Sequence, residues 1–232
     1  MHIGIIGAME EEIRLLKATM GNYETTEIAS FTFYTGELKG KHVTLVQSGI
    51  GKVNATLSVA LLVERFKVDA VLNTGSAGGL GADLHVGDVV IADQLLHHDV
   101  DVTAFGYQMG QMAGMPATYA TDKALADLAE EVYASQGLPV RRGLIVSGDV
   151  FVNSPAQIAQ IKQHFPTALA CEMESAAIAQ AAHVLGVPCL VIRAISDSAD
   201  DEAVMSFDEF IVLAGQKSAE MVLMLLEVMS KL

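Results

Sequence analysis

The sequence predicts an α/β fold of three layers, with a mostly parallel or mixed central sheet flanked by helices. Short apolar runs alternate with longer runs of helical periodicity across the 232 residues. Several short runs are apolar on both faces, which is typical of strands in a sheet that helices cover on both sides. No repeat, low-complexity tract or Pro/Ser-rich linker interrupts the alternation, so we expect a single domain over residues 1–232.

In the first half of the chain, strands are expected where apolar residues run together and end at Gly or Thr. A helix is expected wherever apolar residues recur every three or four positions. The expected strands cover residues 3–7, 30–37, 42–47 and 69–74. The expected helices cover residues 9–20 and 51–66.

The second half continues the alternation after one long irregular stretch. Expected strands cover residues 88–102, 142–147, 168–172 and 189–196, and expected helices cover 122–136, 173–185 and 207–229. The irregular stretch, residues 103–121, contains Gly, Gln, Met and Pro. A loop of this length in a compact domain is usually functional or part of an interface.

Composition excludes several classes of partner. The chain carries 28 acidic and 14 basic side chains, a net charge of −14. Binding to nucleic acid or to an anionic membrane surface needs clustered Lys and Arg, so we expect neither. The uncharged run 175–192 is broken by a Gly-Val-Pro turn, so it does not predict a membrane span. Without an export signal, and with Cys171 and Cys189 expected to be reduced, we expect a cytoplasmic protein.

Ligands of such sheets bind beyond the carboxyl ends of the strands, and acidic side chains follow two of these ends. Glu12 has Met9, Leu15 and Leu16 as its helical neighbours, so it falls on the apolar face of its helix. A carboxylate there is expensive unless it is functional, although an ordinary first-turn acid is the alternative. Glu174 also falls in a first helical turn, where we expect the helix dipole to keep it ionised. An ionised carboxylate can accept the two hydroxyls of a ribose.

Two further strand ends add small residues, an acid and a base. The glycines of the segment 74–79 allow close approach of a ligand, or form only a tight turn. Arg193 and Asp197 end the last expected strand, and roughly 13 Å separates residues at that spacing. The acids at 200–202 follow closely and would raise the pKa of Asp197, as suits a general acid, unless the turn is simply solvated.

His97, Asp99 and Asp101 would share one strand face and could be read as a metal site. Nothing nearby supplies a supporting pattern, so we expect no metal and no cofactor. Two separated carboxylates are instead the equipment for glycosidic-bond cleavage, in which one activates water and the other protonates the leaving group.

Six motifs of the chain resemble those of the bacterial 5'-methylthioadenosine/S-adenosylhomocysteine nucleosidases, in order and spacing from residue 1 to the C-terminus. They are GIIGAMEEE at 4–12, NTGSAGG at 73–79, HDVDVTAFGY at 98–107, GDVF at 148–151, EME at 172–174 and SDSAD at 196–200. The resemblance implies a nucleoside-phosphorylase-like fold and a cofactor-free homodimer. It implies hydrolysis of methylthioadenosine, S-adenosylhomocysteine and 5'-deoxyadenosine to adenine, in methionine salvage and methyl-cycle recycling.

The same resemblance assigns roles by position. Glu12 would activate water and Asp197 would protonate adenine N7. The remaining residues would bind substrate: Glu174 and Met173 at the ribose, Ser76 and Arg193 at the water, Phe151 and Val152 at adenine, Met9, Ile50 and Phe207 towards the 5'-substituent, with Gly78 and Ser196 beside them. Val102 and Phe105 would come from the partner subunit.

The chain departs from the family pattern at Val152, which is smaller than expected, and at Ala113, which replaces a proline in the partner's loop. Two alternative functions stay open. A phosphorylase of the same fold would need an arginine clamp for phosphate, for which Arg193 is the one obvious candidate. A non-catalytic nucleoside sensor would not need Glu12 and Asp197 on opposite sides of one bond.

Overall fold

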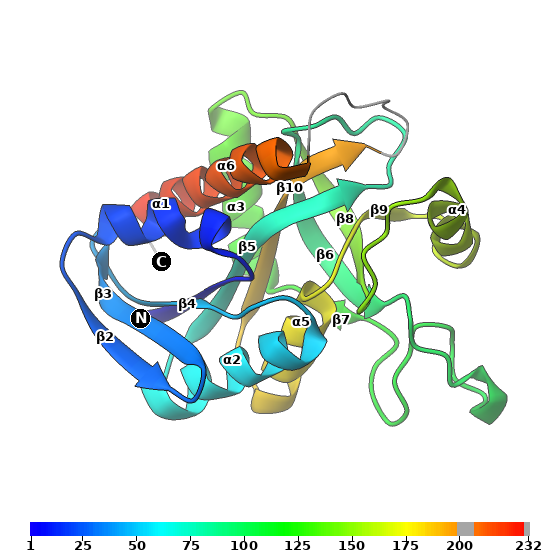
Figure 1. Cartoon of the computed structure of the whole chain (residues 1–232), viewed down its shortest axis with the longest axis horizontal. Helices are drawn as coiled ribbons and strands as arrows, with labels where there is room; N and C mark the ends of the chain where they lie inside the picture. Colours follow the sequence, from blue (N-terminus) through cyan, green and yellow to red (C-terminus); the bar gives the residue numbers. More distant parts are fainter. Residues whose placement is uncertain (199–206, 230–232) are drawn as a thin grey trace.

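The computed structural model describes residues 1–198 and 207–229, with side chains left out at 198 and 207–210 (Figure 1). Its strands are β1 (His2–Gly7), β2 (Tyr23–Ile28), β3 (Phe31–Leu38), β4 (Lys41–Gln47), β5 (Ala70–Gly79), β6 (Val89–His97), β7 (Tyr119–Ala120), β8 (Val140–Ser147), β9 (Ala168–Glu172) and β10 (Cys189–Ser198). Its helices are α1 (Glu10–Met20), α2 (Lys52–Phe66), the 3₁₀ turn η1 (Thr103–Phe105), α3 (Lys123–Ser135), α4 (Pro155–His164), α5 (Ser175–Leu185) and α6 (Phe207–Val228).

One mixed sheet contains all these strands, in the order β10-β6-β8-β9-β5-β1-β4-β3-β2, with β7 beside β6. Strands β4, β1, β5 and β10 are mutually parallel where they pair. Strand β10 also pairs with β6, so β10, β6, β8, β9 and β5 close into a ring. Because β4, β1, β5 and β10 run in one direction, their carboxyl ends lie at one edge of the sheet.

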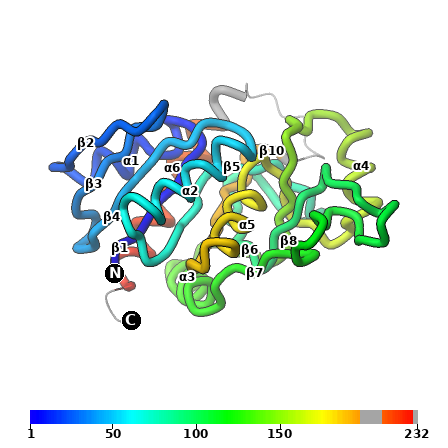
Figure 2. The backbone as a smooth tube through the Cα atoms, turned by 90° about the horizontal axis from the view of Figure 1, so that it is seen from below, coloured from blue at the N-terminus to red at the C-terminus, as the bar shows by residue number. Residues whose placement is uncertain are grey.

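Helices cover both faces of this sheet, as the sequence predicts. Helices α1, α3 and α6 pack on one face around Ile13, Leu16 and Leu225, and α2 and α5 pack on the other around Val59 and Ile178. Figure 2 shows α2 and α5 side by side on their face. Helix α4 lies apart from both layers, beside β8 and β9 (Figure 1). The predicted three-layer α/β fold is confirmed.

Strands β2 and β7 and helix α4 were not expected from the sequence. Strand β2 pairs with β3 at the edge of the sheet and is mostly exposed, so it shows no apolar face. Strand β7 has only two residues. Helix α4 buries only Ile161, and its best signal is the start, where Ser154 accepts from Gln157 N before Pro155. The strand expected over 88–102 ends at His97.

Candidate active site

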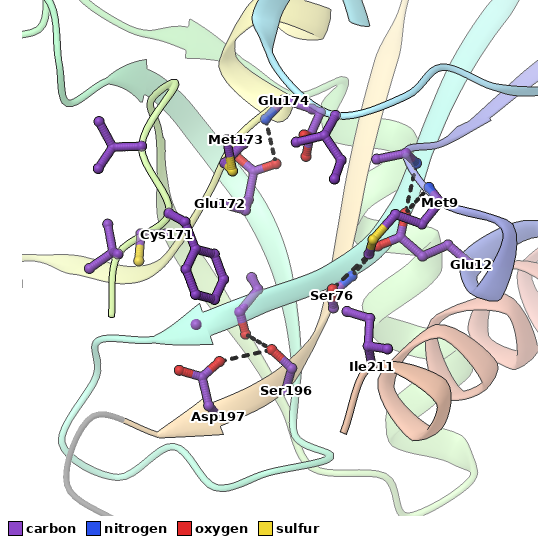
Figure 3. A pocket seen from close by; sticks show the side chains of 17 residues that line it. Met9, Glu12, Ser76, Cys171, Glu172, Met173, Glu174, Ser196, Asp197 and Ile211 are labelled. Carbon is purple, nitrogen blue, oxygen red and sulfur yellow. Dashed lines mark hydrogen bonds between the residues drawn. The ribbon is translucent and has the colours of Figure 1, made fainter. Parts of the chain in front are cut away.

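A cavity with about 650 Å³ of empty space, part of it open to solvent, lies at the carboxyl ends of β1, β5 and β10 (Figure 3). Seventeen residues line it: Ala8, Met9, Glu12, Ile50, Ser76, Ala77, Gly78, Val150, Phe151, Val152, Cys171, Glu172, Met173, Glu174, Ser196, Asp197 and Ile211.

Most of the site residues expected from the sequence therefore lie in one place. The lining includes both expected catalytic residues, Glu12 and Asp197. It also includes the expected binding residues Met9, Ile50, Ser76, Gly78, Phe151, Val152, Met173, Glu174 and Ser196. Figure 3 shows Glu12 beside Met9 and Ser76 on one side of the cavity, Asp197 beside Ser196 on another, and Met173 with Glu174 on a third. Phe207 begins α6, but its side chain lies outside the described part.

The Glu12 side chain is buried and is fixed by four hydrogen bonds. It is only 1% exposed. Its Oε2 accepts from the backbone N–H of Ala8 at 2.7 Å and of Met9 at 3.3 Å. Its Oε1 accepts from the N–H and the hydroxyl of Ser76 at 3.0 and 3.3 Å. These donors compensate the burial of the negative charge and fix its direction.

Gly75 allows the side chains of Arg193 and Glu12 to approach each other. A Cβ at this position would lie 2.1 Å from Arg193 Nη1 and 2.6 Å from Glu12 Oε1. Both side chains thus reach the same point above the backbone of β5, and only glycine leaves that point free.

Arg193 does not line the cavity. Its side chain is 1% exposed and is paired with Glu172. It also donates to Asn73 Oδ1 at 2.8 Å and to Ser175 Oγ at 2.8 and 3.1 Å. Arg193 Nη2 lies 3.7 Å from Glu174. The buried guanidinium therefore pairs with carboxylates of the site and does not present its N–H groups to a ligand in the cavity.

Glu172 is a residue of the site to which the sequence assigned no role. Its carboxylate accepts from Ser147 Oγ, from the backbone N–H of Glu174 and Ser175, and from Arg193. It thereby joins β8, β9, β10 and the start of α5. A carboxylate at a strand end, just before a helix, is a signal that could have indicated this role. Ala8, Ala77, Val150, Cys171 and Ile211 also line the cavity, as small or apolar residues with no chemical signature in the sequence.

Glu174 differs from the expectation in its protonation. Burial, followed by the charge of Glu172, raises the pKa of Glu174 to about 8, although Arg193 and the N–H of Gly51 act in the opposite direction. Gly51 N donates to Glu174 Oε1 at 2.9 Å. Desolvation of the carboxylate outweighs the helix dipole on which the expectation depended.

Asp197 lies at the other side of the cavity and is exposed to it. Ser196 Oγ donates to Asp197 Oδ1 at 2.9 Å, and a register shift between Ile195 and Asp197 places Asp197 opposite Gly78 of β5. A Cβ on Gly78 would lie 3.5 Å from Asp197 Oδ2. The acids at 200–202, which we expected to act on Asp197, lie outside the described residues.

The residues of the possible metal tract separate. His97 Nε2 contacts Gln180 Oε1 at 2.8 Å, Asp99 pairs with Lys52, and Asp101 accepts from Thr103. Within residues 1–198 and 207–229, no three His, Cys, Asp or Glu side chains gather into a group that could hold a metal ion.

Val102 and Phe105, expected to reach the site of a partner subunit, do not line the cavity of their own chain. They belong to the region of η1, and Phe105 is 82% exposed. Among the described residues, none of the helices has the length and apolar character needed to cross a membrane.

The model of the phosphorylase superfamily matches residues 2–227 of the chain. A 5'-methylthioadenosine/S-adenosylhomocysteine nucleosidase of Aeromonas salmonicida is 52% identical over 227 residues, which are 97% of this chain and 99% of the relative. The chain belongs to this nucleosidase family of the phosphorylase superfamily.

Solved structures of the family share the fold along the whole chain. The nucleosidase of Neisseria meningitidis in complex with methylthio-immucillin-A superposes with a TM-score of 0.94 at 50% identity, covering 97% of this chain and 98% of the other. The nucleosidase of S. pneumoniae with the transition-state inhibitor MT-ImmA has a TM-score of 0.94 at 49% identity, covering 99% and 100%. The expected family is therefore confirmed.

Proposed function

We propose that this protein hydrolyses the N-glycosidic bond of 5'-methylthioadenosine and S-adenosylhomocysteine, and of 5'-deoxyadenosine, releasing adenine and the 5'-substituted ribose. The observation that carries the proposal is the placement of Glu12 and Asp197 on different sides of one cavity (Figure 3). The names of relatives and solved structures at 49–52% identity, one of them in complex with a transition-state inhibitor, support the substrate class. These reactions belong to methionine salvage and methyl-cycle recycling.

In this proposal Glu12 takes a proton from water as the water attacks the anomeric carbon. Ser76 orients the carboxylate by its two hydrogen bonds, and Arg193 Nη1 reaches the same point above Gly75. A carboxylate that is already oriented toward the water lowers the barrier to proton transfer, because no solvent must reorganise around it.

On the opposite side, Asp197 donates a proton to adenine N7 while the glycosidic bond lengthens. The sugar develops positive charge at that moment, and the leaving adenine becomes neutral rather than anionic. The Ser196 hydroxyl donates a hydrogen bond to Asp197 Oδ1, which leaves Oδ2 to protonate adenine.

The remaining lining residues would hold the nucleoside between these two groups. Glu174 would form hydrogen bonds with the ribose hydroxyls, and Met173 would pack against the sugar. Phe151 would stack on adenine and the backbone of Val152 would read its edge, so the small side chain at 152 changes little. Met9, Ile50 and Phe207 would form the apolar region towards the 5'-substituent.

A phosphorylase is the less favoured alternative. Among the described residues that line the cavity, none is Lys, Arg or His, whereas Glu12, Glu172, Glu174 and Asp197 are acidic. Phosphate would meet these carboxylates before it met Arg193, which is already paired. The charge of the cavity therefore favours water as the nucleophile.

We also propose that the protein is a homodimer in which Val102 and Phe105 complete the site of the partner subunit. Phe105 is 82% exposed, and Val53 on α2, three residues beyond the cavity-lining Ile50, is 70% exposed. Large exposed apolar side chains beside a site are typical of an interface. A cytoplasmic location stays a prediction from the sequence.

The test is to follow adenine release from methylthioadenosine in phosphate-free buffer and to identify the sugar. The expected result is free adenine and free methylthioribose, at a rate that added phosphate does not change. Strict dependence on phosphate, with the sugar 1-phosphate as product, would indicate the phosphorylase. Binding of the nucleoside without any adenine release would indicate the sensor.

A further inference from the structure

An ion pair outside the cavity joins the start of α2 to the segment after β6. Lys52 Nζ lies 2.7 Å from Asp99 Oδ1 and 2.8 Å from Oδ2. The two side chains are 20% and 22% exposed, so the pair is largely shielded from water. Burial alone would raise the pKa of Asp99, but the hydrogen bonds from Lys52 and from Asp149 N hold it below its ordinary value. The Asp99 carboxylate is therefore ionised at neutral pH.

Asp149 ties a third segment to this pair through two hydrogen bonds. Its backbone N–H donates to Asp99 Oδ2 at 2.9 Å. Its carboxylate Oδ1 accepts from Lys52 N at 2.8 Å. Helix α2 has Gly51 at its N-cap and therefore no capping side chain of its own. Asp149 supplies that cap from 97 residues away, so the N-terminus of α2 depends on the segment after β8.

The backbone around Asp149 is closely fitted. A Cβ on Gly148 would lie 2.5 Å from the ring of His98 and 3.1 Å from the carboxyl carbon of Asp99. Gly51 has φ +95°, and a Cβ there would lie 3.1 Å from Asp149 Oδ1. Both glycines permit approaches that a side chain would block. The three segments are therefore closely packed around Asp149.

Both chain segments that Asp149 joins continue directly into the cavity. Val150, Phe151 and Val152 follow it and line the cavity, and Phe151 is 56% exposed, so burial alone does not place it. On the other segment, Ile50 lines the cavity and Gly51 N donates to Glu174 Oε1. Asp149 therefore connects residues 150–152, which are expected to contact adenine, with Glu174, which is expected to bind the ribose.

We propose that Asp149, held by the Lys52–Asp99 pair, is a positioning residue for substrate binding: it sets the segment 150–152 against the base and the Gly51 N–H against Glu174. Asp149 does not line the cavity and touches no substrate. The inference rests on the proposed nucleosidase function, because it assigns the base to the segment 150–152. It predicts that losing the Asp149 carboxylate weakens binding much more than it slows chemistry.

The decisive comparison is Asp149→Ala against Asp149→Asn. The asparagine keeps an oxygen that can accept from Lys52 N, whereas alanine does not. We expect Asp149→Ala to raise KM for methylthioadenosine and Kd for adenine about tenfold, with kcat within about threefold. Asp149→Asn should recover most of the binding. Asp83→Ala, at an exposed acid away from the cavity, is the matched control and should leave both constants unchanged.

A second measurement does not depend on catalysis. Hydrogen exchange of the free protein should become faster at the amides of residues 50–53 and 148–152 in Asp149→Ala, and in Lys52→Met, which removes the charge of the pair. These data decide the matter even if Asp149→Ala folds poorly, because Lys52→Met keeps the Asp149 side chain and removes only the ion pair that holds it. Unchanged exchange in both segments would overturn the proposal.

The kinetic outcomes are equally distinct. A fall in kcat and in thermal stability with KM unchanged would show a merely structural role and overturn the proposal. If the wild-type protein releases no adenine, the proposed function fails, while adenine affinity and hydrogen exchange still test the positioning by Asp149.

Discussion

Ser76 donates both its N–H and its hydroxyl to the same oxygen of Glu12, at 3.0 and 3.3 Å. The other oxygen of Glu12 accepts from the backbone of Ala8 and Met9. The end of β5 and the turn after β1 therefore hold one carboxylate between them. A base fixed by four donors has one orientation, and that orientation faces the cavity.

The first prediction is that Glu12→Gln removes turnover. The amide cannot take a proton from water, so kcat should fall by about 10²–10⁴-fold or more. The side-chain NH₂ must also face one pair of N–H donors, which leaves those donors unpaired and costs about 1–3 kcal/mol of folding free energy. Adenine release and thermal unfolding measure the two effects.

Glu10→Gln is the control for this experiment, since Glu10 belongs to the same helical turn but does not line the cavity. It should leave turnover and stability nearly unchanged. Near-normal turnover of Glu12→Gln would show that Glu12 is only an N-terminal helix acid.

The sequence predicts the fold well because its strongest elements are those with continuous apolar faces. The positions of Glu12, Glu174 and Asp197 can also be predicted, because all three follow strand ends, where ligands bind in such sheets. Burying a carboxylate there costs desolvation free energy, so a functional role is the simplest reason for its presence. Helical spacing brings both Glu10 and Glu11 within reach of Arg14, and Arg14 lies 3.8 Å from Glu11, because exposed helical pairs can exchange partners at little cost.

What the sequence does not predict depends on contacts between distant segments. Glu172 has its role only because β8, β9 and β10 come together around it. The raised pKa of Glu174 depends on its burial and on the charge of Glu172, whereas the local sequence shows only a first-turn acid. The cap of α2 by Asp149 spans 97 residues, so no local motif announces it.

The second prediction concerns pH and Glu174. Because its pKa in the folded protein is raised from 4.5 to about 8, the folded state keeps a proton that the unfolded chain has released. The stability that Glu174 contributes is complete below its unfolded pKa and is lost as pH rises through about 8. Glu174→Gln does not titrate and keeps an acceptor for Gly51 N, so it avoids this loss.

Thermal unfolding of both proteins from pH 4 to pH 9 checks this. The melting temperature of Glu174→Gln should rise relative to that of the wild type as pH increases across the range. Two parallel curves would contradict a raised pKa at Glu174. Glu220→Gln, at a side chain that accepts from Gln216 one helical turn away, serves as the control and should run parallel to the wild type.

The third prediction concerns the proposed dimer. If Phe105 completes the site of a partner subunit, Phe105→Asp should weaken association, because a charge replaces an apolar side chain that the partner would bury. Activity per subunit should then fall with dilution at higher concentrations than for the wild type, in step with sedimentation. A wild-type monomer that is fully active at nanomolar concentration would count decisively against shared sites.

The last prediction is that Asp197→Asn abolishes cleavage of adenine nucleosides. Asparagine can still accept from Ser196 Oγ, so the local structure should persist, but it cannot donate the carboxyl proton. Adenine would then have to leave as an anion, which makes it a poor leaving group. The same defect can be produced in the substrate, because a 7-deaza analogue has carbon where the proton should bind. This analogue should bind the wild-type protein and resist cleavage, and turnover at a rate near that of methylthioadenosine would show that Asp197 does not protonate N7. Asp197→Asn should lose little further activity on the analogue, since the step that the variant lacks is already missing there.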